Sequence, residues 1–546
     1  MTLTEVAREL LAKRYLLPGE TPSDLFRRVA HAINSPKEKE FLAMMENQLF
    51  LPNSPTLMNA GAPEGQLSAC FVLPVEDTIE GIFTTLAHMA IIHKTGGGTG
   101  FSFSKVRPRG DNVSGTVGVA SGPVSFIEVF DKATDAVKQG GKRRGANMAV
   151  LASWHPDIRE FIRSKMGGGL SNFNISVAFD ARFFQARSAG KEYPLINPRD
   201  GSVRGTEDPE ALWKAIGEAA WATGDPGMIF LDEINRRNPT PGLGLIEATN
   251  PCGEQPLYPF ESCNLGSINL SLFVRKGEID WDALRITVRD CVDFLDGVID
   301  VNRFPIPQIT EMTRLTRKIG LGVMGFAELL IKLGIPYSSP RALETGERIM
   351  AFIQTEAKQR SRELGEQKGS FPAIDRSIYA GAMRNSTVTT IAPTGSLHIV
   401  ANTSSGIEPL FSLAYTRIIA DTPVEIVNDL VKDLAKKYPQ QDILSHVRKT
   451  GSIQDLNLPD EVRDLYRIAP EIGHEQHVRM QAVFQKHVDN GVSKTVNMAE
   501  NSTIDEICAI YDLARTLGCK GITIYRYNSK KNQVMSRGCE ICKVED

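Results

Sequence analysis

The sequence has 546 residues, of which 42% are hydrophobic and 23% charged, a composition that is ordinary for a globular protein. Its net charge of −3 argues against a global basic field for nucleic acid or an anionic membrane surface. No run of about 18 apolar residues occurs and the charged N-terminal segment is unlike a signal peptide, so we expect a cytoplasmic protein without a membrane span. Eight cysteines in so long a chain are expected to be reduced thiols.

The pattern of apolar and polar residues divides the chain into three segments. Residues 1–50 are predicted to be helical, because Ser and Thr caps precede apolar residues at helical spacing, as in TPSDLFRRVAHAI. Over residues 51–530, short apolar runs bounded by Gly, Asn and Pro alternate with helical stretches, which predicts an α/β fold and favours a barrel. Residues 531–546 are charged and poor in apolar residues, so we expect a mobile tail.

The segment NPCGEQPLYPFESCNLGSINL, residues 250–270, raises the first functional question. It contains Cys252 and Cys263, with Glu254 two residues after the first thiol and Asn250 two residues before it. Such a segment could be a metal knuckle, a disulfide, or a site where thiols carry out redox chemistry on a substrate. These residue types alone leave all three interpretations open.

The other cysteines narrow the choice. Three of them are interpreted as small buried hydrophobes (Cys291, Cys508 and Cys519). Cys539 and Cys542 form a C-x-x-C pair in the tail, but no second close Cys or His pair occurs, so zinc is the weaker interpretation and we predict no metal site. The C-x-x-C spacing suits dithiol exchange, which implies that a buried disulfide elsewhere needs reduction. Cys70, which begins an apolar run, and Cys263 could form it.

Segments rich in glycine and hydroxyl groups predict contacts to phosphate. The turn APTGSLH, residues 392–398, follows an apolar run and offers backbone N–H groups to an anion, although such turns also serve as helix caps. A second hydroxyl-rich loop covers residues 51–61, and residues 93–111 combine close glycines with two arginines. Neither a Walker A motif nor a Rossmann fingerprint is present, so a nucleotide would be held in another way.

Together these motifs resemble the catalytic chain of ribonucleotide reductase, in particular the class II type that depends on adenosylcobalamin. The resemblance extends over residues 14–534 and includes, in one order, NSPTLMNAG, SACFVLPVEDTIEGI, KTGGGTGFSFSKVRPRG, NPCGEQPL, ESCNLGSINL, RKIGLGVMGFAELL, APTGSLHIVANTSSGIEPLF and FQKHVDNGVSKTVNM. It implies a ten-stranded α/β barrel of two half-barrels with a central finger loop, preceded by a small helical N-terminal region.

The resemblance also implies a reaction. Ribonucleoside di- or triphosphates would be reduced to 2′-deoxyribonucleotides by a thiyl radical at Cys252, at the tip of the finger loop. Glu254 would act as general base on the 3′-OH, and Asn250 would orient the sugar hydroxyls. Cys70 and Cys263 would protonate the departing 2′-OH and supply two electrons, ending as a disulfide.

Substrate contacts are implied in the same way. The phosphate would lie on Ser54, with backbone contacts near Ala69 and Gly98. The remaining contacts come from the turn Pro393, Thr394, Gly395, Ser396 and Leu397. Both diphosphate and triphosphate substrates are compatible with these residues.

Regulation and partners are implied as well. A deoxynucleotide effector at a homodimer interface would contact Asp77 and Arg107, and residues 164–172 would pass its signal to the substrate. The ATP-binding cone of some relatives is not found before the catalytic segments, so we expect specificity control without shut-off by dATP. Cys539 and Cys542 would re-reduce the active-site disulfide and receive electrons from a thioredoxin-like partner.

Two other functions stay open. A class I-like catalytic chain would need a separate metallo-radical subunit and a tyrosine relay; here Tyr525 and Tyr527 are separated by Arg526, and we interpret Tyr527 as incidental. A non-catalytic nucleotide-binding regulator would keep the phosphate loops and lose the cysteines, which this chain retains. A glycyl-radical enzyme is disfavoured because no R-V-x-G-Y-type segment occurs near the C-terminus.

Overall fold

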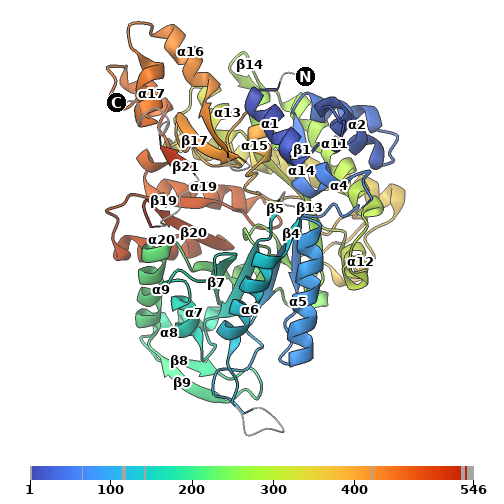
Figure 1. Ribbon diagram of the computed structural model, residues 1–546, viewed down its shortest axis with the longest axis vertical. Helices are drawn as coiled ribbons and strands as arrows, with labels where there is room; N and C mark the ends of the chain where they lie inside the picture. The colour runs from blue at the N-terminus through green and yellow to red at the C-terminus, as the bar shows by residue number, and fades with distance from the viewer. Residues whose placement is uncertain are drawn as a thin grey trace.

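The computed structural model describes residues 3–63, 65–112, 119–139, 143–419, 422–529 and 535–537. Its centre is a ten-stranded sheet. Helices cover the outside of the sheet (Figure 1). Within the described ranges, no helix is long and apolar enough to cross a membrane.

Three helices precede the barrel: α1 (Glu5–Arg14), α2 (Pro22–Ala32) and α3 (Glu38–Glu46). Thr21 and Asp24 form a capping box at the start of α2, so the cap that the sequence predicts is present. The apolar faces of these helices enter a core that they share with the barrel; Phe26 and Phe41 are fully buried in it. The predicted helical N-terminal region is therefore confirmed.

Five parallel strands form the first half of the barrel. In spatial order they are β2 (Cys70–Leu73), β3 (Gly98–Ser102), β6 (Asn147–Ala152), β7 (Phe173–Phe179) and β10 (Gly227–Phe230). All residues of β6 are buried, as expected for a parallel strand with one face toward helices and the other toward the barrel interior.

The second half joins the first through antiparallel pairs, β13 with β2 and β20 with β10. It contains β13 (Ser262–Asn269), β16 (Ile319–Met324), β19 (Thr495–Met498) and β20 (Gly521–Arg526). The gap between β16 and β19 is bridged by residues 387–391, through the isolated bridges Leu321 to Thr389 and Ile391 to Val492. β1 (Phe50–Pro52) adds antiparallel to β13. The predicted barrel of two halves is thus confirmed.

A hairpin of β11 (Ala248–Thr249) and β12 (Pro256–Leu257) passes through the barrel interior. A Cβ atom on Gly100 of β3 would lie 1.7 Å from the carbonyl oxygen of Thr249. A Cβ atom on Gly491 would lie 2.6 Å from the carbonyl oxygen of Gly253. Because both contacts are to backbone, glycine at these two positions gives the hairpin its room, and the hairpin is the predicted finger loop.

Helices surround the barrel. The larger ones are α5 (Ile79–Lys94), α6 (Pro123–Ala136), α9 (Pro209–Thr223), α11 (Trp281–Val301), α12 (Pro307–Thr316), α14 (Pro340–Lys368), α19 (His474–Lys486) and α20 (Ile504–Thr516). Shorter ones are α4 (Ser54–Asn59), α7 (Ile158–Arg163), α8 (Ala181–Ser188), α10 (Leu231–Arg236), α13 (Phe326–Lys332) and α15 (Leu397–Val400).

Two additions extend from this body. The hairpin β8 (Tyr193–Ile196) and β9 (Val203–Glu207) lies at the lower end of Figure 1. At the upper end, α16 (Asp429–Lys437), α17 (Ile443–Thr450) and α18 (Asp460–Leu465) pack near a sheet of β17 (Ala414–Ile419), β18 (Thr422–Val427) and β21 (Met535–Arg537). Strand β21 pairs with β17, an interaction that the sequence did not predict.

Candidate active site

The tip of the finger hairpin is held in shape by Asn250. Its side-chain oxygen accepts a hydrogen bond from the backbone N–H of Gln255 at 2.9 Å, and its backbone oxygen accepts one from Gly253 at 3.1 Å. Gly253 adopts a φ of 79°, which favours glycine. The tight turn presents Cys252 at the surface of the hairpin, whereas Asn250 and Glu254 are buried.

Asn250, Cys70 and Glu254 form one hydrogen-bonded chain. The amide nitrogen of Asn250 donates to the sulfur of Cys70 at 3.0 Å. The Cys70 thiol in turn points at Oε1 of Glu254, 3.8 Å away. The three side chains come from two segments 180 residues apart in sequence, and the barrel brings them into contact.

Glu254 is a carboxylate in a dry environment. Its exposed fraction is 3%, and burial raises its pKa from 4.5 to about 7. The second oxygen, Oε2, is buried without a hydrogen-bond partner in the structure. Burying a carboxylate oxygen without a hydrogen bond costs folding free energy. This atom therefore marks a position where a ligand hydroxyl could donate the missing hydrogen bond.

Cys263 lies directly opposite Cys70, in the neighbouring strand β13. Residues directly opposite in an antiparallel pair have Cα atoms about 4.5–5.5 Å apart, within the range of a disulfide. Both cysteines are reduced in the structure, and burial raises the pKa of each thiol well above its ordinary value. The pair can therefore hold two protons and two electrons.

A buried ion pair lies behind Cys263. The ammonium of Lys318 is 2.8 Å from Oε2 of Glu261, and both side chains are at most 1% exposed. The Cys263 thiol is 3.6 Å from the backbone oxygen of Lys318. The positive charge of Lys318 opposes the effect of burial on the pKa of Cys263.

A cavity of about 280 Å³ opens onto these groups. Cys70, Asn250, Cys252 and Glu254 all line it. So do all the residues that the sequence analysis assigned to the substrate: Ser54, Ala69, Gly98, Pro393, Thr394, Gly395, Ser396 and Leu397. Cys263 is the one predicted active-site residue that does not line the cavity, because it lies behind Cys70.

Arg14 and Tyr15, for which no role was predicted from the sequence, also line this cavity. The hydroxyl of Tyr15 is 2.9 Å from that of Ser54, and a guanidinium nitrogen of Arg14 donates to Ser396 at 3.4 Å. Both residues lie at the end of α1, more than 200 residues before the finger loop. The family resemblance begins at Arg14 and so could have drawn attention to both residues, but only the packing of α1 against α15 reveals their position beside the cavity.

A second, larger cavity of about 800 Å³ lies on the other side of the finger tip. Cys252 lines both cavities, with Pro251 and Gly253 beside it in the larger one. Tyr525 also lines the larger cavity, whereas Tyr527 lines neither. The thiol of Cys252 therefore borders both a cavity the size of a small metabolite and one that can hold a large organic ligand.

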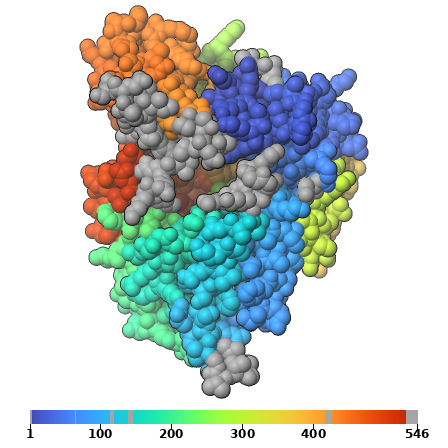
Figure 2. Space-filling view, in the orientation of Figure 1, coloured from blue at the N-terminus to red at the C-terminus, as the bar shows by residue number. Residues whose placement is uncertain are grey.

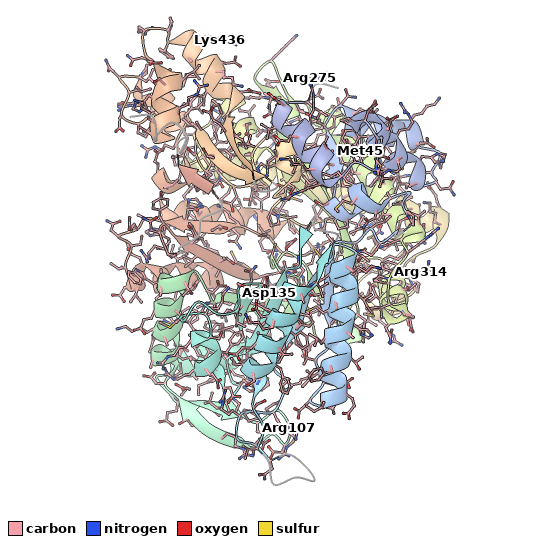
Figure 3. All side chains as sticks on the ribbon, viewed as in Figure 1. Met45, Arg107, Asp135, Arg275, Arg314 and Lys436 are labelled. Carbon is pink, nitrogen blue, oxygen red and sulfur yellow. The ribbon has the colours of Figure 1, made fainter. Side chains whose placement is uncertain are left out.

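The predicted effector residues lie outside both cavities. Arg107 donates through Nε and its backbone N–H to Asp77, at 2.8 and 3.0 Å. Figure 3 shows Arg107 at the lower end of the molecule, toward the β8–β9 hairpin of Figure 1. The tail pair, Cys539 and Cys542, falls outside the described residues.

Residues 164–172 connect to the finger loop through β7. Lys165 forms an ion pair with Asp225 at 2.8 Å and donates to the backbone oxygen of Phe173. One residue further, Asn174 donates to the backbone oxygen of Pro251 at 2.8 Å, next to Cys252. In the described part of the chain, no group of three or more His, Cys, Asp or Glu side chains could hold a metal ion.

Comparison with known proteins agrees with this geometry. A solved structure, the class Id ribonucleotide reductase alpha subunit of Actinobacillus ureae, superposes with a TM-score of 0.80 over 96% of this chain and 97% of that one, at 24% identity. The two chains therefore share a fold. The family model "Ribonucleotide reductase, barrel domain" matches residues 68–383 and 374–525, and "Ribonucleotide reductase, all-alpha domain" matches residues 1–65. The chain belongs to the ribonucleotide reductase family.

Two curated relatives are more similar in sequence. A vitamin B12-dependent ribonucleoside-diphosphate reductase of Thermoplasma acidophilum is 52% identical over 91% of this chain. One of the same name from Mycobacterium tuberculosis is 45% identical over 98% of it. The chain spans 66% of the length of the Thermoplasma relative and 81% of the Mycobacterium one.

Proposed function

We propose that this chain reduces ribonucleotides to 2′-deoxyribonucleotides by thiyl-radical chemistry. The main support for this proposal is the position of Cys252, which lines two cavities. The Cys70–Cys263 pair and the unpaired oxygen of Glu254 lie on the side of the smaller cavity. A nucleotide-binding regulator would have no use for a thiol pair and a desolvated carboxylate converging on one point.

The reaction balances with these groups. A thiyl radical at Cys252 removes the hydrogen atom from C3′, and Glu254 takes the proton of the 3′-OH. Cys70 protonates the 2′-OH, which leaves as water. The two thiols supply two electrons and two protons, their sulfur atoms form a disulfide, and Cys252 returns its hydrogen atom to C3′. One ribonucleotide and two thiols thus become one deoxyribonucleotide, one disulfide and one water.

Asn250 supports two of these steps. Its amide nitrogen donates to Cys70, so it fixes the thiol that must face the 2′-OH. Because its side-chain oxygen closes the turn at the finger tip, it also fixes the distance between Cys252 and Glu254. In the proposed reaction it orients the sugar as well.

Adenosylcobalamin is the proposed cofactor. The larger cavity has the size class of a large organic ligand, and two buried polar atoms on its wall, Oε1 of Gln481 and Oγ of Ser404, have no partner in the structure. A cofactor with many amide groups can supply those partners. When bound, adenosylcobalamin supplies an organic radical. Since Cys252 borders this cavity directly, the thiol needs no relay through other side chains.

The competing radical source is a separate metallo-radical subunit. Relatives that are 52% and 45% identical are named vitamin B12-dependent, which favours the cofactor. The test is anaerobic turnover by the purified chain alone, with adenosylcobalamin, dithiothreitol, a cytidine nucleotide and a deoxynucleotide effector. We expect deoxycytidine product, and none from Cys252→Ala.

Two results would count against the proposal. Product from Cys252→Ala would remove the radical cysteine. Turnover that requires an added metallo-radical subunit, and is indifferent to cobalamin, would assign the chain to class I and make Tyr525 a relay candidate. Comparing CDP with CTP in the same assay decides whether the substrate is a di- or a triphosphate.

Regulation by a homodimer is part of the proposal. Three large apolar side chains on α5 are exposed: Ile79, Phe83 and Ile91. Helix α6 packs beside α5, and the surfaces of the two segments adjoin in Figure 2. Asp77 precedes α5 by two residues, so an effector bound there would touch this face. A second copy of the chain would cover the apolar side chains and complete the effector site. The contacts of Lys165 and Asn174 give a path from residues 164–172 to the finger tip.

Re-reduction of the Cys70–Cys263 disulfide completes the cycle. We propose that Cys539 and Cys542 deliver electrons to it from a thioredoxin-like partner, because C-x-x-C spacing suits dithiol exchange. Replacing both by Ser should leave turnover with dithiothreitol intact and abolish turnover with thioredoxin. Equal loss with both reductants would contradict this role.

A further inference from the structure

Arg14 is the one cationic side chain among the described residues that line the smaller cavity, and Glu254 is the one carboxylate. The two charged groups lie in different parts of the cavity wall. Glu254 is hydrogen-bonded to Cys70, which Asn250 contacts in turn. Arg14 is hydrogen-bonded to Ser396. The cavity is therefore polarised, with a sugar-side carboxylate and a separate guanidinium.

Among the described residues, no carboxylate lies within ion-pair distance of the Arg14 guanidinium, whose hydrogen bond to Ser396 is long, at 3.4 Å. A half-buried guanidinium with five donors and one weak acceptor retains most of its capacity for an anion.

A position in the last turn of α1 would by itself favour a cation, because the helix dipole is negative there. That explanation accounts for Lys13, which forms an ion pair with Glu9 on the same helix. It does not account for the direction of Arg14, which contacts a side chain 382 residues away rather than a carbonyl oxygen of α1.

Neutral donors surround the same place. The hydroxyls of Tyr15 and Ser54 are 2.9 Å apart, and Ser54 and Ser396 both line the cavity. Thr394 is oriented by a hydrogen bond from the backbone N–H of Gly406 at 2.9 Å. Hydroxyl donors around one guanidinium are the chemistry that recognises a phosphate group.

We propose that Arg14 is a substrate ligand that binds the terminal phosphate of the nucleotide, so that the N-terminal helices form one wall of the active site. This inference rests on the proposed function, because it assumes that the substrate sugar lies at Cys252 and Glu254. A substrate extended between these two ends places its phosphates toward Arg14 and Ser396. The role predicts an effect on nucleotide affinity and little on the chemical step.

The test is direct binding of CDP to the reduced chain in the absence of cobalamin, compared with binding of cytidine measured by competition. Arg14→Gln should weaken CDP binding about tenfold to a hundredfold and leave cytidine binding unchanged, because only CDP carries the phosphates. Arg14→Lys should recover part of the loss. In turnover, KM should rise for Arg14→Gln while kcat changes less than about threefold.

The matched control is Arg8→Gln, which removes an exposed arginine from the same helix. It should change the affinity for neither CDP nor cytidine. Equal weakening of CDP and cytidine by Arg14→Gln would show that the substitution damages the site, and would overturn the proposal. So would unchanged CDP binding. If wild-type protein binds neither CDP nor CTP, the proposed function fails instead. If wild type turns over and Arg14→Gln matches it in KM, the function stands and the role of Arg14 does not.

Discussion

Glu254→Gln removes the carboxylate that the barrel interior desolvates, and keeps its shape. Burial raises the pKa of Glu254 from 4.5 to about 7, so the folded protein is destabilised whenever this group is ionised. The free-energy cost is about 3 kcal/mol, since each tenfold change in an ionisation equilibrium corresponds to about 1.4 kcal/mol. Gln carries no charge at any pH and avoids this cost.

The size of the effect of Glu254→Gln on stability depends on pH. Below about 4.5, Glu254 is protonated in both folded and unfolded chains, and the variant and wild type should be equally stable. As pH rises to about 7, the unfolded chain ionises first and wild-type stability falls relative to Glu254→Gln. Above about 8 the difference should level off at about 3 kcal/mol in favour of the variant.

Activity should change in the opposite direction. The general base must be ionised, so wild-type kcat should rise with pH through about 7, and Glu254→Gln should lose about a hundredfold to ten-thousandfold. The assay combines urea unfolding of both proteins at pH 5 and pH 8 with anaerobic turnover across the same range. An infrared band of the protonated carboxyl group that titrates near pH 7, and is absent from the variant, would identify the group.

Two outcomes would refute this reasoning. If the variant is equally stabilised at pH 5 and pH 8, the effect arises from packing and not from a desolvated charge. If the variant retains wild-type turnover, Glu254 is not the base, whatever its pKa.

Three further predictions follow from the same contacts. With Cys539 and Cys542 both replaced by Ser and no added reductant, the reduced chain should form deoxynucleotide and lose two thiols, which peptide mapping should find at Cys70 and Cys263. Adding Cys263→Ser should abolish product, and a disulfide between any other pair in this tail-blocked chain would exclude the assignment. Lys318→Met leaves Glu261 as an uncompensated buried charge, so it should lower the free energy of unfolding in urea by about 3–5 kcal/mol. A loss below about 1 kcal/mol would show that water reaches the pair. Phe83→Lys on the exposed face of α5 should shift sedimentation from dimer to monomer and abolish the response of activity to deoxynucleotides. Arg8→Gln is the control and should change neither property. A dimer that persists in Phe83→Lys would show that the interface lies on another surface.

Local sequence was sufficient for the elements whose signals are local. The Thr21 cap, the helical spacing of the N-terminal segment and the alternation of apolar runs with helices predicted elements that the structure contains. The arrangement of Asn250, Cys252 and Glu254 could also be anticipated, because a turn of six residues at the tip of a hairpin keeps them close. The particular barrel and the pairing of Cys70 with Cys263 followed from the family resemblance, since neither periodicity nor spacing specifies them.

Tertiary structure decided everything that depends on distant segments. The 800 Å³ cavity beside Cys252 exists because barrel strands, the finger tip and residues 393–430 meet there, and no single stretch of sequence encodes its volume. Burial of Glu254, and with it the raised pKa, comes from walls contributed by many strands. Arg14 reaches the smaller cavity only because α1 packs against α15, which lies more than 380 residues further along the chain. The sequence by itself determined which chemical groups are available and which short segments hold them; folding determined which of them meet, because contact and desolvation depend on position in space and not on order in the chain.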